Sequence, residues 1–231
     1  MPRNTNVVAS ASAVSGVHPQ VRVFVRPYGS PIPLGFFAFG IGMFLYAALD
    51  AGWVKPADQQ SIGLLLATFV FPLQVIATVF AFLCRDGAAG TALGLFSTSW
   101  LAGGVLLAIG TPGELDAAFG YYLVAFAIVI VALAAASIAG RPLLSIFLVV
   151  SSARTILGAV YELGGGHGWG VASGWVALAT FCVALYAGLA FLLEDTLGRT
   201  VFPLARVGAA RASIEADLPE QLVALADEAG V

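Results

Sequence analysis

The stretch SPIPLGFFAFGIGMFLY, residues 30–46, decides the fold, because two prolines lead directly into a long apolar run. A proline is tolerated in the first turn of a helix, where the N–H that it lacks would have no partner. Pro31 and Pro33 therefore mark the start of a helix, and the apolar residues that follow continue it through Tyr46. The stretch predicts a first transmembrane helix with a distinctive opening turn.

The composition of the whole chain indicates a membrane protein. Its 231 residues are 60% hydrophobic and only 10% charged, whereas a soluble domain carries about 25% charged residues. A soluble protein with a large core is the alternative, but this chain has too few charges to cover a water-facing surface. The net charge of −3 also argues against nucleic-acid binding, which needs clustered lysines and arginines.

Six apolar runs follow one another along the chain, each near the roughly 20 residues that cross a bilayer. Short connections containing Gly, Pro or charged residues separate them, so neighbouring helices must be antiparallel. We predict an all-α membrane protein with a six-transmembrane-helix bundle, its helices at residues 33–53, 61–84, 91–110, 116–138, 143–163 and 170–193. The predicted parts are a flexible cytoplasmic N-terminal arm (1–29), the six-helix domain (30–204) and a cytoplasmic C-terminal tail (205–231).

The positions of arginine and lysine predict the orientation, because cytoplasmic segments of membrane proteins carry an excess of both. The arm, the second and fourth loops and the tail hold eight arginines, and the other side holds only Lys55. Both termini are therefore predicted to be cytoplasmic, in a multi-pass protein of the plasma (inner) membrane. The eight arginines are Arg3, Arg22, Arg26, Arg85, Arg141, Arg199, Arg206 and Arg211.

Polar side chains inside the predicted helices are the candidates for function, because each is costly in hydrocarbon. Arg154 costs at least about 2.5–3.5 kcal/mol near a helix centre, so it needs a water-filled path or an acidic partner, for which Glu162 and Asp50 are candidates. It is therefore either half of a structural ion pair or a charge that attracts anions to a pathway. Gln74 offers donors and acceptors to a neighbouring helix or to a substrate.

Residues for catalysis or metal binding are poorly placed. His18 lies in the arm and His167 in a glycine-rich loop, and neither can easily serve as a base to a buried serine. Cys84 and Cys182 are expected to be free thiols, and the sequence has no metal-ligand spacing. We therefore expect neither an enzyme nor a cofactor.

Two motifs at the ends of the helical domain resemble those of a known family. Residues 30–36, SPIPLGF, resemble the Asn-Pro-Ala-Pro-Leu-Gly-Leu signature of the acetate uptake transporters, which include the bacterial succinate–acetate permease and the fungal acetate permeases. Residues 198–203, GRTVFP, are similar to the family's Gly-Arg-Thr-Val-Leu-Pro ending. Gln74 falls where the family has a helix-two glutamine, so the resemblance covers about residues 30–203.

The resemblance implies a membrane transporter or channel for acetate and related small mono- or dicarboxylates, with succinate taken up by some members. It implies six helices around a pore in each protomer, a homohexamer, and a narrow hydrophobic constriction. The constriction residues correspond to Phe39, to Phe96 in place of a helix-three tyrosine, and to Val150 in place of a helix-five leucine. Such an apolar ring suits the methyl group of acetate and resists hydrated ions by dewetting.

The opening turn of the first helix is the predicted substrate vestibule on the cytoplasmic side. A helix N-terminus offers unpaired N–H groups and a partial positive charge, which attract a carboxylate. Ser30 replaces the signature asparagine and keeps an oxygen that can cap the helix, and Arg154 falls where the bacterial permease is apolar. The predicted substrate-binding residues are Ser30, Pro31, Pro33, Leu34, Gly35, Gln74 and Arg154.

Two other functions stay open alongside carboxylate transport. One is a channel for a small neutral solute such as urea or ammonia. The other is a membrane sensor or scaffold that signals through the C-terminal tail. The residues distinguish neither a channel from a proton-coupled symporter nor one preferred acid from another.

Overall fold

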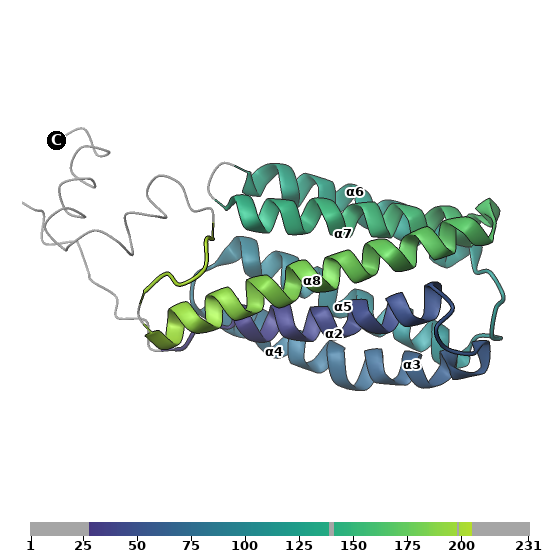
Figure 1. Ribbon diagram of the computed structural model, residues 1–231, viewed down its shortest axis with the longest axis horizontal. Coiled ribbons are helices and arrows are strands. Elements are labelled where there is room, and N and C mark those ends of the chain that lie inside the picture. The colour runs from purple at the N-terminus through teal and green to yellow at the C-terminus, as the bar shows by residue number, and fades with distance from the viewer. Residues whose placement is uncertain (1–27, 139–140, 198, 205–231) are drawn as a thin grey trace, which may run out of the picture.

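The computed structural model describes residues 28–138, 141–197 and 199–204, which form helices and connections with no strand among them (Figure 1). The predicted tail and nearly all of the predicted arm lie outside the described residues. The helices, in chain order, are α2 (Ile32–Asp50), η1 (Pro56–Asp58), α3 (Gln59–Leu65), η2 (Leu66–Val70), α4 (Phe71–Leu83), α5 (Gly87–Ile109), α6 (Ala117–Ser137), α7 (Pro142–Val160), η3 (Tyr161–Gly165) and α8 (His167–Leu197).

Six helical segments are long and apolar enough to cross a membrane, which confirms the predicted fold class of a multi-pass membrane protein. Successive segments run in opposite directions, so α2 begins and α8 ends at the same end of the bundle (Figure 1). We call this end the signature end, after residues 30–36, and the end that holds Asp50 the opposite end. The segments are Ile32–Asp50, Pro56–Leu83, Gly87–Ile109, Ala117–Ser137, Pro142–Gly165 and His167–Leu197.

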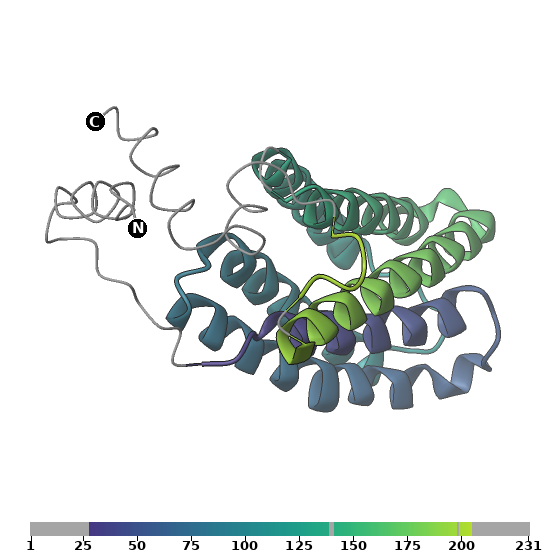
Figure 2. The ribbon, with the colours of Figure 1, turned by 60° about the vertical axis from the view of Figure 1, so that its left-hand side comes forward.

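The first span, α2, is the innermost of the six. Of an 18-residue apolar stretch in this span, 61% is buried inside the bundle, and the buried share of the corresponding stretch in each other span is 50% or less. α8 packs along α2 in the antiparallel direction, and α6 and α7 lie side by side as a hairpin against α8 (Figures 1 and 2). The residues of the opening stretch are therefore held between several helices.

Close helix crossings depend on glycine at two places. A Cβ on Gly174 of α8 would lie 2.7 Å from the backbone nitrogen of Ala51, at the end of α2. A Cβ on Gly63 of α3 would lie 2.5 Å from the carbonyl oxygen of Gly104 on α5. Any side chain at these positions would force the helices apart, because the atom that it meets belongs to a backbone.

The second span is interrupted where the sequence predicts one continuous helix. Pro72 has no N–H to donate to the preceding turn, and the π turn η2 ends at Val70, two residues before it. Within this turn the N–H of Phe71 bonds to the carbonyl of Leu66, five residues back. The span that carries Gln74 is therefore two α-helices, α3 and α4, joined by a wider turn.

Helices α5 and α8 begin three or more residues earlier than predicted. α5 begins at Gly87 rather than at residue 91, because the Asp86 carboxylate accepts a hydrogen bond from the Ala89 N–H (3.1 Å) and caps the helix. α8 begins at His167 rather than at residue 170. Asp86 also pairs with Arg141 at 2.6 Å, which joins the second and fourth loops at the signature end.

The ending motif folds back toward α8. The Tyr186 hydroxyl on α8 donates a hydrogen bond to the Pro203 carbonyl (2.7 Å), and its ring lies 5.8 Å from that of Phe202. Both motifs that carry the family resemblance therefore lie at the signature end of the bundle.

Candidate functional site

The predicted opening of the first helix is present, but its cap differs from the prediction. α2 begins at Ile32, with Pro31 at the N-cap position and Pro33 in the first turn. No side chain caps this helix, so the predicted capping role of Ser30, which precedes the N-cap, is wrong. Both prolines are buried, whereas Leu34 is exposed.

A small cavity lies beside this opening turn, in the half of the bundle toward the signature end. Its volume is about 30 Å³, which is room for about two water molecules. The first turns of three helices line it, through Ile32 of α2, Ala89 of α5 and Leu144 of α7. Gly35 also lines it, and a Cβ there would meet the end of the flexible Leu93 side chain at 2.6 Å.

Four aromatic rings line the cavity, Phe36, Phe39, Phe96 and Phe147. We call Phe39 and the two rings that pack against it, Phe96 and Phe147, the ring cluster. The Phe39 centroid lies 4.8 Å from that of Phe96 and 4.7 Å from that of Phe147, both with edge-to-face geometry. Trp100 packs against Phe39 at 5.3 Å. Phe39 is only 1% exposed, so the rings close this part of the bundle.

The structure brings together two of the three predicted constriction residues and adds a third ring from α7. Phe39 and Phe96 are in contact, whereas Val150 is half-buried and lies one turn beyond Phe147 on the same helix. Sequence reasoning missed Phe147, whose one available signal was its position three residues before Val150, on nearly the same helix face. The role of Val150 stays a prediction.

Gln74 joins three helices in the fully buried centre of the bundle. Its Nε2 atom donates to the carbonyl of Gly35 on α2 (3.1 Å), and its Oε1 atom accepts from the indole N–H of Trp100 on α5 (2.7 Å). Gln74 is therefore an interhelical link, which is one of the two roles predicted for it. Because it also lines the cavity, contact with a substrate stays a prediction.

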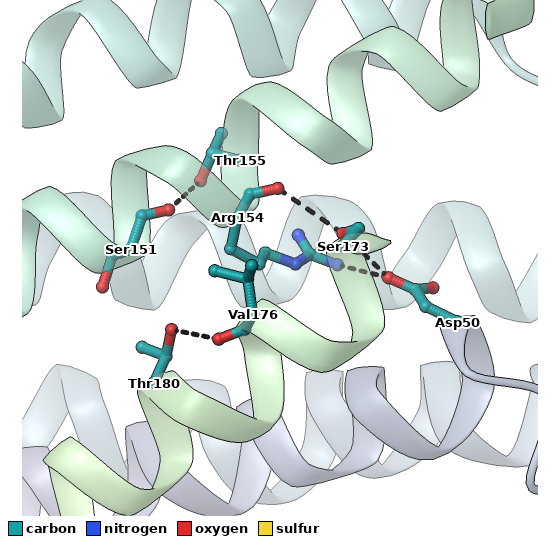
Figure 3. A network of polar contacts seen from close by, with 7 residues as sticks. All are labelled: Asp50, Ser151, Arg154, Thr155, Ser173, Val176 and Thr180. Atoms are coloured by element: carbon teal, nitrogen blue, oxygen red, sulfur yellow. Dashed lines mark hydrogen bonds and ion pairs between the residues drawn. The ribbon is translucent and has the colours of Figure 1, made fainter. Parts of the chain in front are cut away.

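Arg154 lies toward the opposite end and pairs with Asp50, one of its two predicted partners (Figure 3). Nη2 of Arg154 lies 3.3 Å from Oδ2 of Asp50, and the Ser173 hydroxyl donates to the same oxygen at 3.1 Å. The guanidinium also lies over the ring of Tyr46, 4.0 Å from its centroid. Its Nε atom is buried and has no hydrogen-bond partner among the described residues.

Glu162, the other predicted partner of Arg154, bonds to the start of α6 instead. It lies in the π turn η3, and its carboxylate accepts a hydrogen bond from the backbone N–H of Asp116 (2.8 Å). Asp116 in turn caps α6 by accepting from the Ala118 N–H at 2.9 Å. Within the described residues, no three His, Cys, Asp or Glu side chains are grouped to hold a metal ion.

Comparisons with known proteins identify the family. A search of curated protein sequences found no match. The fold is similar to the solved structure of the bacterial acetate channel SatP, with a TM-score of 0.67 and 20% sequence identity over 77% of this chain and 99% of that chain. The model of the GPR1/FUN34/yaaH family matches residues 15–206, which include both end motifs. The predicted resemblance is therefore confirmed, and the chain belongs to the GPR1/FUN34/yaaH family.

Proposed function

We propose that this protein forms a transmembrane path for acetate and related small carboxylates. Its family and the fold that it shares with the bacterial acetate channel SatP support a transport function rather than catalysis. The observation that carries the proposal is the cavity at the signature end with the ring cluster in its wall. This arrangement puts a small space beside helix N-termini directly in front of a closely packed apolar ring cluster.

The helix ends around the cavity favour an anion. The first turns of α2, α5 and α7 all line it, and a helix N-terminus carries about half a unit of positive charge. The Asp86 carboxylate caps α5, but it is itself paired with Arg141 at 2.6 Å. A carboxylate that enters from the signature end would therefore meet the first turns of three helices beside residues 30–35.

The ring cluster then selects the permeating group by its hydration. Phe39, Phe96 and Phe147 carry no hydrogen-bond donor or acceptor that could replace the water shell of an ion. The indole N–H of Trp100 is already bonded to Gln74. A methyl group gains from contact with these rings, and passage requires them to rotate, because Phe39 is closed off in this structure.

Orientation, membrane and assembly complete the proposal. The arginine distribution supports a plasma (inner) membrane protein with both termini and the signature end on the cytoplasmic side. The family resemblance supports a homohexamer with one path in each protomer. Competition by succinate tests it as a second substrate, and a protonophore tests whether uptake is coupled to protons.

Uptake of radiolabelled acetate into proteoliposomes tests the proposal. We expect uptake above that of protein-free liposomes, reduced by excess propionate or succinate but not by urea. Sensitivity to a protonophore would indicate symport. Absence of acetate uptake would contradict the proposal, and uptake of urea in its place would favour the neutral-solute channel. Deletion of residues 209–231 should leave uptake intact, which a sensor acting through the tail does not predict.

A further inference from the structure

A charged cluster in the other half of the bundle lies apart from the cavity (Figure 3). It consists of Asp50 on α2, Arg154 on α7, Ser173 on α8 and the ring of Tyr46. We propose that this cluster is a second carboxylate site, at which a substrate carboxylate replaces that of Asp50 on the Arg154 guanidinium. The inference rests on the proposed function and adds a binding group to it.

Arg154 has more hydrogen-bonding capacity than the protein uses. A guanidinium carries five N–H donors, and the side chain of Arg154 is only 7% exposed. Within the described residues its one hydrogen bond goes to Asp50, while Nε is buried without a partner. Leaving a charged donor unpaired in the interior is costly, so an anion with two oxygens would satisfy donors that the protein leaves open.

Asp50 indicates which chemical group this site accepts. The end of an aspartate side chain is a carboxylate on a methylene, which is an acetate tethered to α2. One of its oxygens, Oδ2, receives both the Arg154 contact at 3.3 Å and the Ser173 hydroxyl at 3.1 Å. The Arg154 contact is single rather than the bidentate fork that gives the strongest pairs, which favours exchange with a free carboxylate.

Gly158 faces the guanidinium and tolerates a methyl group. A Cβ built on Gly158 would lie 3.6 Å from Oγ of Ser173 and 3.8 Å from Nη1 of Arg154, and both are ordinary contact distances. The nearest other atom belongs to Leu123, also at 3.6 Å. A methyl group at this position would therefore lie beside the guanidinium, where an incoming carboxylate has to approach.

Aromatic contacts connect this second site to the ring cluster. The ring of Tyr46, under the Arg154 guanidinium, lies 5.7 Å from that of Trp100. Trp100 in turn lies 5.3 Å from Phe39. The second site therefore lies beyond the ring cluster, toward the opposite end.

Chemical rescue by acetate tests the site without measuring transport. Asp50→Ala removes the tethered carboxylate and leaves Arg154 without its acceptor. The thermal unfolding midpoint is measured in detergent micelles against sodium acetate, with sodium chloride at equal ionic strength as the reference. We expect acetate to raise the midpoint of Asp50→Ala at an about tenfold lower concentration than in the wild type, because a tethered group competes at high effective concentration.

Three controls sharpen this result. Asp58→Ala removes an exposed carboxylate that accepts a hydrogen bond from the Lys55 backbone N–H (3.2 Å) and should show no such acetate effect. Arg154→Met in the Asp50→Ala background should abolish the rescue. Equal acetate dependence in Asp50→Ala and the wild type, or persistence of the rescue in the double variant, would overturn the inference.

Gly158→Ala keeps the test decisive if Asp50→Ala does not fold. The added methyl makes only ordinary contacts, so the variant should fold but lose the acetate-dependent rise of the wild-type midpoint. Gly168→Ala, whose methyl meets no atom within 4 Å, is the matched control and should keep that rise. No difference between the two variants would overturn the inference.

Uptake measurements separate this inference from the proposed function. The double variant Asp50→Ala/Arg154→Met should lower uptake at low acetate about tenfold, the factor that corresponds to one lost charged contact. Unchanged uptake in the double variant would put Arg154 off the path and overturn the inference while leaving the proposed function intact. Absence of uptake by the wild type would instead contradict the proposed function.

Discussion

Replacing Gln74 with leucine tests how the three central helices are held together. The substitution replaces the amide with an apolar side chain of similar size and so removes both hydrogen bonds, to the Gly35 carbonyl at 3.1 Å and from the Trp100 indole at 2.7 Å. An indole N–H left buried without an acceptor costs about 1–3 kcal/mol. The loss of an interhelical bond adds about 1 kcal/mol. We therefore expect Gln74→Leu to destabilise the protein by about 2–4 kcal/mol.

Equilibrium unfolding of the purified protein in mixed micelles measures this change. Thr78→Val is the matched control, because the Thr78 hydroxyl donates to the Gln74 backbone carbonyl within its own helix (2.7 Å), and the loss of this bond should cost less than about 1 kcal/mol. Trp100→Phe removes the stranded donor, so in the Gln74→Leu background it should cost less than it does alone. The reasoning is refuted if Gln74→Leu is no worse than Thr78→Val and the double-mutant cycle shows no coupling.

Two further substitutions test the packing in the same unfolding assay. Gly63→Ala should destabilise the protein by about 1–3 kcal/mol, because its methyl would meet the Gly104 carbonyl oxygen at 2.5 Å. Gly87→Ala is the control, since its methyl would meet nothing within 4 Å, and its stability should stay within about 0.5 kcal/mol of the wild type. Equal effects of the two substitutions would contradict the close crossing of α3 and α5. Arg154→Met alone should lower the free energy of unfolding by about 3–5 kcal/mol, because it leaves the Asp50 carboxylate unpaired in the interior. The double variant Asp50→Ala/Arg154→Met removes both charges and should lose less stability. A double variant that is less stable than Arg154→Met would contradict the ion pair.

The six spans were predictable because length and apolar composition alone define them. Their interruptions were not. The π turn before Pro72 reflects a missing N–H, and the early start of α5 reflects one carboxylate, that of Asp86, which bonds to the helix end. Both are local hydrogen-bonding events inside or beside an apolar run, and hydropathy does not register them.

The site was predictable only as far as family resemblance places a residue on a helix. Phe39 and Phe96 correspond to constriction residues of the family and do meet. Phe147 enters the cluster because of the rotation of α7 about its own axis, which no single-helix pattern specifies. The choice of Asp50 over Glu162 as partner of Arg154 likewise depends on how α2, α7 and α8 cross.

The relative uptake of acetate and propionate through Phe39 variants tests the central claim most directly. The claim is that a carboxylate passes the ring cluster, so Phe39→Ala should raise the propionate-to-acetate uptake ratio in proteoliposomes by opening space for one more methylene. Phe69→Ala removes a ring that is 46% exposed on the outside of the bundle and should leave the ratio unchanged. An unchanged ratio in Phe39→Ala, from protein that remains folded, would contradict the claim.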